Sequence, residues 1–192
     1  ESKTIRPNHS VNMGYGFGKT IKEKCELNYD GRMSQNKFDN TTHSASYLRL
    51  IALDQNFGNL VSDINNKGIN NFINQSFRVK LKLDTVGGEW VNDVNFNFSN
   101  SNTDQNYSNV LVSKSTVSGG DGTFGNDRNY FTYQSDIRKK INGINLESGI
   151  KTSVLHFNNH SEYTKNSGGQ ISPDPFRTSS FRYTEQINAA YV

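Results

Sequence analysis

The sequence has one cysteine, three prolines and no long apolar run. Cys25 alone can form neither an internal disulfide nor a site with several thiolate ligands, so we interpret it as a small apolar side chain on a strand. The longest apolar runs, such as LIAL at 50–53, are far shorter than the roughly 18 residues of a transmembrane helix. The first residues, ESKTIRPNHS, lack the charged and apolar regions of a secretion signal.

The composition is polar without being strongly charged. Only 32% of the residues are apolar, which would give one domain of 192 residues a thin core. The net charge of +3 comes from scattered Lys and Arg and not from a basic run, so we expect no nucleic-acid partner. Asn and Ser dominate, with 27 and 21 copies, yet 12 Phe and 9 Tyr are far more aromatic residues than a disordered chain has. The composition favours a structured all-β protein.

Apolar and charged residues alternate in FRVKLKLDTVGGEWVNDVNFNF at 77–98. Phe77, Val79 and Leu81 alternate with Arg78 and Lys80, and the pattern resumes after a Gly-Gly turn. A strand of a soluble sandwich buries one face and exposes the other to water. A strand of an outer-membrane barrel also alternates, with its apolar side toward lipid and its polar side toward a water-filled lumen.

Seven alternating runs are present, and the connections between them are alternately short and long. The runs form hairpins within 11–33, 77–98 and 131–157, followed by a last run at 181–191. Outer-membrane barrels have short turns at one end and long loops at the other, with spanning strands of about 9–11 residues. We therefore predict an all-β fold of antiparallel up-and-down strands that form a segment of a transmembrane β-barrel. The open edges would be residues 10–21 and 180–192.

The pattern also predicts local features that the structure can test. The phase slips at Leu155 and Phe157, which suggests a β-bulge. The polar segments 34–74 and 159–179 are predicted to be long loops that contact a ligand, since loops carry recognition on a rigid scaffold. The glycine-rich GGDGTF at 119–124 is interpreted as a flexible loop tip.

One face of the predicted strands is expected to contact lipid. The residues assigned to it are Val11, Met13, Tyr15, Phe17, Leu27, Tyr29, Val79, Leu81, Leu83, Val94, Phe96, Phe98, Leu146, Ile150, Val154, Ile187 and Tyr191.

Catalytic and metal-binding patterns are weak. His9, His43, His156 and His160 are scattered and have neither helical spacing nor a cysteine partner, so we interpret them as solvated side chains. No nucleophile elbow or paired acid and base stands out. We predict no catalytic residue, no metal and no cofactor, and hence a protein that is not an enzyme.

Several segments resemble a known family. GYGFGKTIKEKCELNYDGRMSQ, the stretch from FRVKLKL to SNTDQN, YQSDIRKKINGINLESGIKTS and FRYTEQINAAYV resemble successive hairpins of the outer-membrane β-barrel family of Bacteroidetes, the barrel portion of TonB-dependent receptor-like proteins. The positions that carry this resemblance are individually weak, and they include Asp136, Glu147, Gly149, Ala190 and Tyr191.

The resemblance implies a location in the outer membrane of a Gram-negative bacterium. It also implies a large barrel, closed around a plug, that imports a bulky nutrient with energy from the inner membrane. Residues 1–192 show no plug domain and no energy-coupling segment, so we expect them to be a partial barrel domain, a wall segment. The expected partners are outer-membrane lipid and the remainder of the barrel, with a plug domain and a surface lipoprotein as further candidates.

One alternative remains open from the sequence. A secreted, soluble β-sandwich that acts as a binding or adhesion module would also alternate apolar and polar residues. It would be a soluble monomer that unfolds cooperatively, whereas a barrel wall would be insoluble without detergent.

Overall fold

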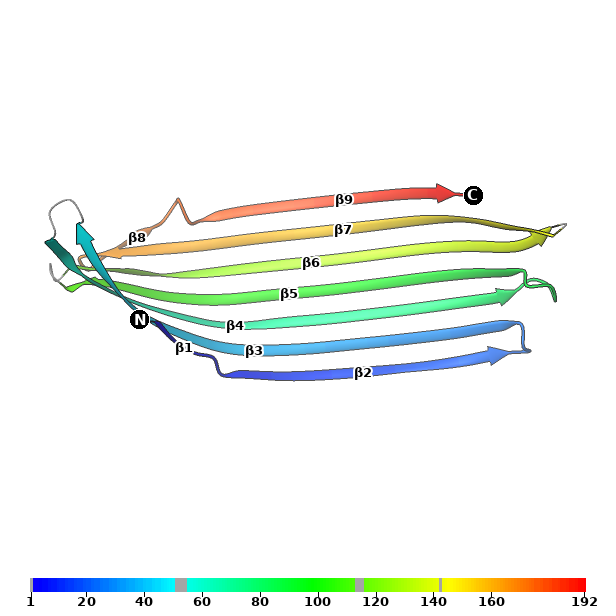
Figure 1. Cartoon of the computed structure of the whole chain (residues 1–192), viewed down its shortest axis with the longest axis horizontal. Helices are drawn as coiled ribbons and strands as arrows, with labels where there is room; N and C mark the ends of the chain where they lie inside the picture. Colours follow the sequence, from blue (N-terminus) through cyan, green and yellow to red (C-terminus); the bar gives the residue numbers. More distant parts are fainter. Residues whose placement is uncertain (1, 51–54, 113–115, 142) are drawn as a thin grey trace.

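A computed structural model describes residues 2–50, 55–112, 116–141 and 143–192. They form one antiparallel sheet (Figure 1). The described residues include no helix that is long and apolar enough to cross a membrane. The strands are β1 (Ser2–Ile5), β2 (Asn8–Ile21), β3 (Cys25–Leu50), β4 (Gln55–Lys82), β5 (Glu89–Leu111), β6 (Thr116–Ile141), β7 (Ile144–Ser167), β8 (Gln170–Pro173) and β9 (Ser179–Tyr191).

The nine strands lie along seven lines. β1 and β2 pair with successive parts of β3, and β8 and β9 pair with successive parts of β7. Between them, β3 to β7 pair in chain order. This arrangement confirms the seven predicted runs, and β2 and β9 form the predicted edges (Figure 1). Since all the described strands belong to one sheet, the β-sandwich alternative is wrong.

Short turns join the strands at one end of the sheet, as predicted (Figure 1). Between β2 and β3, Lys22 and Glu23 adopt left-handed backbone conformations with φ of 49° and 56°. Between β4 and β5, the Asp84 carboxylate accepts hydrogen bonds from the backbone N–H groups of Val86 (3.0 Å) and Gly88 (2.7 Å). Such local bonds fix a tight turn.

The long polar segments also lie at one end, opposite the short turns, but the prediction that they are loops is wrong. The described parts of 34–74 belong to β3 and β4, and 51–54 lie outside the described residues. GGDGTF belongs to β6, and most of 159–179 belongs to β7 and β8, with a loop at 174–178. β4 has 28 residues, which corresponds to roughly 90 Å of extended chain.

Cross-strand amide contacts explain why Asn-rich segments form strands. Asn66 accepts a hydrogen bond from Gln105 (2.7 Å), and Ser101 donates one to Asn70 (2.5 Å). Asn100 likewise donates to Asp127 across β5 and β6. Asn has a low intrinsic preference for strands, but contacts between directly opposed side chains offset it. We call the parts of these strands that lie far from the short turns the polar arms; they are residues 36–50, 55–70, 100–111, 116–127 and 158–167.

The register assigns each residue to one of two faces. Directly paired residues share a face, and alternate residues along a strand switch faces. We call the face with the most apolar residues the apolar face and the opposite one the polar face. Fourteen predicted lipid-facing residues share the apolar face: Val11, Met13, Tyr15, Phe17, Leu27, Tyr29, Val79, Leu81, Val94, Phe96, Phe98, Leu146, Ile150 and Val154.

Three other predicted residues differ. Leu83 lies just after β4. Tyr191 pairs with Gly149 and Ile187 with Ser153, which places both on the polar face, so they cannot face lipid together with the other fourteen.

The predicted bulge is also wrong. The pairing of β6 with β7 keeps one register past Leu155 and Phe157, so these two side chains lie on the polar face. The apolar residues of β7 therefore move from one face to the other at this point, while the pairing of β6 with β7 stays regular.

The apolar face carries a belt that runs diagonally across the sheet. On β2 it begins at Val11, which the register connects strand by strand to Asn158 of β7. On β7, however, the first belt residue is Val154, four residues nearer the short turns. The other limit shifts equally, from Ile21 to Ile144. Besides the fourteen residues above, the belt contains Ile21, Cys25, Met33, Ile73, Phe77, Trp90, Phe131, Tyr133, Ile137, Ile141 and Ile144.

This diagonal gives the tilt of the strands. Four residues along a strand are about 13 Å and five strand spacings are about 24 Å, which together correspond to a tilt of roughly 30°. Strands of closed barrels are inclined by about 35–45° to the barrel axis. The belt therefore crosses these strands at nearly the angle that strands of a closed barrel make with the barrel axis.

A single sheet leaves few residues fully buried. Val91, which is 8% exposed, is the one buried apolar side chain among the described residues. A sheet needs a second layer to bury its apolar face, and the described strands supply none. The belt therefore requires an apolar environment from outside the chain.

Aromatic rings cover glycines on neighbouring strands at several positions. Tyr15 lies over Gly31, Phe38 over Gly68 and Tyr163 over Gly122, and in each case the two residues are directly paired. A Cβ on any of these glycines would collide with the ring. Such pairs cover the exposed backbone at glycine and help to fix the register.

We predict that Gly31→Ala destabilises the barrel. The added methyl group would occupy the position of the Tyr15 ring, and overpacking of this kind costs about 1–3 kcal/mol. The measurement is the free energy of unfolding of the full-length protein in lipid vesicles. Gly14→Ala is the control, because a Cβ there meets only a backbone oxygen at 3.9 Å. Equal effects of the two substitutions would contradict the role of the ring.

Candidate functional site

The polar face carries a ladder of ion pairs near the short turns. Its members come from β3 to β7, and the register places them on one face. The pairs are Lys82 with Glu26 (3.6 Å), Lys80 with Glu89 (2.5 Å), Arg78 with Asp93 (3.4 Å), and Arg138 with both Glu89 (3.3 Å) and Glu147 (3.1 Å).

Glu89 is the centre of this ladder. Its carboxylate lies between Lys80 and Arg138, and its side chain is only 22% exposed. Each carboxylate in the ladder contacts a cation, and Glu89 contacts two. The charges of the ladder can therefore contact water or a polar partner while each carboxylate keeps a cation beside it.

A second contact on this face joins residues far apart in the sequence. The Tyr191 hydroxyl donates a hydrogen bond to the Asp136 carboxylate across β7. Gly149 lies between them in the register, and a Cβ on it would collide with both side chains. Three positions of the family resemblance thus meet at one place, and their role there is to hold β9 against β7.

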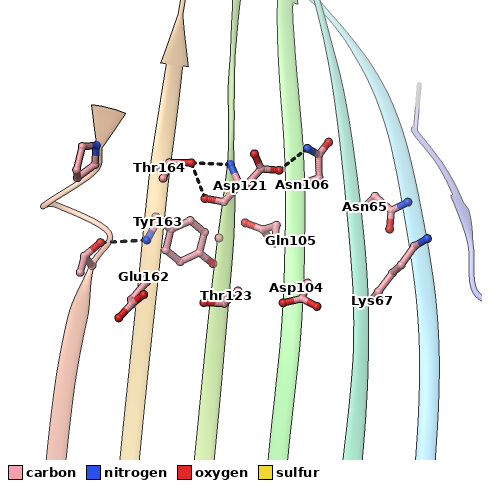
Figure 2. Close-up of a pocket in the computed structure, with 13 residues that line it drawn as sticks. Asn65, Lys67, Asp104, Gln105, Asn106, Asp121, Thr123, Glu162, Tyr163 and Thr164 are labelled. Carbon is pink, nitrogen blue, oxygen red and sulfur yellow. Dashed lines mark hydrogen bonds between the residues drawn. The ribbon is translucent and has the colours of Figure 1, made fainter. Parts of the chain in front are cut away.

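A cavity of about 850 Å³ lies in the polar arms and crosses β4 to β7 (Figure 2). Asp121 links its strands, because its carboxylate accepts a hydrogen bond from Asn106 (2.6 Å) and its backbone bonds to the Thr164 hydroxyl. The buried amide oxygen of Asn65 has no hydrogen-bond partner in the described part of the chain. Most of the lining side chains share the face of the apolar belt: Asn65, Lys67, Asp104, Asn106, Asp121, Thr123, Glu162 and Thr164.

The loop 174–178 is fixed on the opposite side of the same arms. The Arg177 guanidinium lies 4.0 Å from the Tyr163 ring centre and 4.6 Å from that of Tyr107. It also donates a hydrogen bond to Gln105 (2.9 Å). Cation–π contacts of this kind hold the loop against the polar face.

The cavity brings together parts of the two segments that we predicted to contact ligand. Asn65 and Lys67 come from 34–74, and Glu162, Tyr163 and Thr164 from 159–179. Sequence reasoning missed the two strands between them, with residues 104–106 and 121–123. Of these, 121–123 belong to GGDGTF, which we interpreted as a flexible loop tip. Ligand contact by these segments stays a prediction.

The four histidines do not meet. His43 contacts Asp63, His156 bonds with Thr184 (3.0 Å), and His160 covers Gly125. His9 lies on β2, the edge strand.

Comparisons with known proteins support the barrel interpretation. The model of a family described as an outer membrane protein beta-barrel family matches residues 81–192, more than half of the chain. A search of curated proteins found no match.

We predict that Glu89→Gln lowers the thermal midpoint more than Glu147→Gln does. The first change leaves Lys80 and Arg138 without their shared carboxylate, whereas the second leaves Arg138 paired with Glu89. Because salt screens such charges, the difference should shrink in 1 M salt, where the Debye length is about 3 Å. Thermal unfolding of the full-length variants at low and high salt is the measurement. A difference that salt does not change would contradict an electrostatic origin.

Proposed function

Because this chain belongs to the outer membrane protein beta-barrel family and forms part of a barrel wall in the outer membrane, we propose that it comes from a TonB-dependent receptor-like protein of Bacteroidetes that takes up a nutrient. The apolar belt faces lipid, and the polar face lines the lumen. The short turns lie on the periplasmic side, because outer-membrane barrels place short turns there and longer extensions outside. The polar arms then project from the cell surface.

The polar face is the observation that supports uptake of a polar solute. It carries ion pairs near the turns and amide pairs farther along, such as Asn74 with Asn97 (2.5 Å), so water can contact it along the sheet. Seven strand lines cannot close a bacterial barrel, which has an even strand number. Further strands would close the sheet into a wider barrel with room for a plug and a bulky nutrient, because barrel diameter grows with strand number.

Ion conductance tests this proposal. The full-length protein in a planar lipid bilayer should carry no steady current, because a plug fills the lumen, and current should appear when urea unfolds the plug. An unplugged diffusion pore of the same family would conduct steadily without urea. Steady current in the native protein would therefore contradict a plugged receptor.

A further inference from the structure

Two further cavities lie side by side on the polar face, at mid-height in the sheet. One, of about 360 Å³, is lined by residues that include Arg32 and Ser34, and the other, of about 320 Å³, by residues that include Ser99 and Arg128. Phe72 lines both cavities. The register confirms that these residues share the polar face, since Ser34, Phe72, Ser99 and Arg128 are paired in one row.

Both arginines lack a partner in the described part of the chain. Neither guanidinium forms an ion pair or a hydrogen bond there, whereas Arg78 and Arg138 on the same face are paired with carboxylates. The residues paired with Arg32 are Gly14 and Asn74, which carry no charge. The two cations at this height thus have no carboxylate partner in the described part of the chain, and the nearest acidic residue of β3 on the same face is Asp30, two residues from Arg32.

The apolar component of the site is equally unusual for its position. Phe72 is 39% exposed although it lies among polar neighbours, with Ser34 and Ser99 on either side. Tyr130 lines the second cavity and lies in the same row as Arg32. An exposed ring between two free guanidinium groups offers a flat apolar surface with a cation on each side.

We propose that this arginine shelf, defined as Arg32, Phe72, Asn97, Ser99, Arg128 and Tyr130, binds an anionic ligand with a flat ring or sugar face. A guanidinium binds carboxylate or phosphate oxygens in bidentate fashion, and the ring of Phe72 packs against the apolar face between them. Arg32 and Arg128 stand three strand spacings and one row of the register apart, about 16 Å between their Cα atoms. The ligand therefore carries acidic groups toward both ends. The inference rests on the proposed function, because it needs a lumen that solutes can enter.

Charged thiol reagents test whether the two arginines make the shelf attractive to anions. In the full-length protein with Cys25→Ser, one cysteine is introduced by Ser99→Cys on the shelf or by Asn95→Cys, which lies on the same face and strand but nearer the turns. The rate ratio of an anionic to a cationic methanethiosulfonate should be about threefold to tenfold higher at position 99 than at 95, because opposite charges a few ångströms apart attract. Arg128→Gln should lower the ratio at 99 toward that at 95.

Arg182→Gln is the matched control. Arg182 is also unpaired in the described part of the chain but lies on the apolar face, so its loss should leave the ratio at position 99 unchanged. Equal ratios at 99 and 95, or no effect of Arg128→Gln, would overturn the shelf. Reaction at 95 in that case would still show a water-accessible lumen, whereas no reaction at either position would count against the proposed function itself.

A pair of matched probes tests the ligand class. Biphenyl-4,4'-dicarboxylate should protect the cysteine at position 99 from a neutral thiol reagent and slow its modification at least threefold. The uncharged biphenyl-4,4'-dicarboxamide should not protect it. Phe72→Ala should weaken the protection by the dicarboxylate without changing the charge-dependent rate ratio. Equal protection by the two probes, or none by either, would refute an anionic ligand at this site.

Discussion

The hydrogen-bonded register between neighbouring strands is the constraint on which the rest of the structure depends. Because side chains alternate with a period of two, a slip of one residue would move every side chain of a strand to the other face. The pairing of β3 with β4 shifts only between residues 48 and 49, and the belt and ion-pair ladder lie in its regular part. A sheet without a second layer thereby keeps an apolar side and a polar side apart from β2 to β7.

The same register links the barrel to its environment. The diagonal belt stays level only when the strands tilt, and tilted strands are what a closed barrel needs. Beyond the belt both faces are mostly polar. There the strands continue because amide side chains pair with each other and aromatic rings cover glycines, as Tyr163 covers Gly122. The long strands thus combine a barrel wall with a polar, hydrogen-bonded extension beyond the belt.

The sequence was sufficient to predict the parts of the fold where two different environments meet. Residues 77–98 alternate because one face is apolar and the other charged, and the structure places them in β4 and β5 as expected. The polar arms could not be predicted in this way, since Asn66 and Gln105 face similar surroundings to their neighbours and leave no period in the sequence. Their strand structure depends on partners across the sheet.

The face on which each β9 side chain lies could not be predicted from the sequence, for a related reason. Ile187 and Tyr191 look like lipid-facing residues within their own strand, and only the pairing with β7 reveals that they share a face with Asp136. Likewise, the shelf around Phe72 is formed from four strands, and each contributes an inconspicuous residue. Such sites depend on the pairing register between strands, and the residue pattern along one strand does not reveal that register.

Lipid contact of the apolar belt is the central claim, and quenching by brominated lipid tests it most directly. A fluorescent probe is attached to a cysteine at position 81 and then at position 80 of the full-length protein, with Cys25→Ser, in lipid vesicles. The two positions are adjacent on β4, but the register places them on opposite faces. Strong quenching at position 81 and weak quenching at position 80 is the expected result, whereas equal protection of both from lipid would contradict a barrel wall with its apolar belt in the membrane.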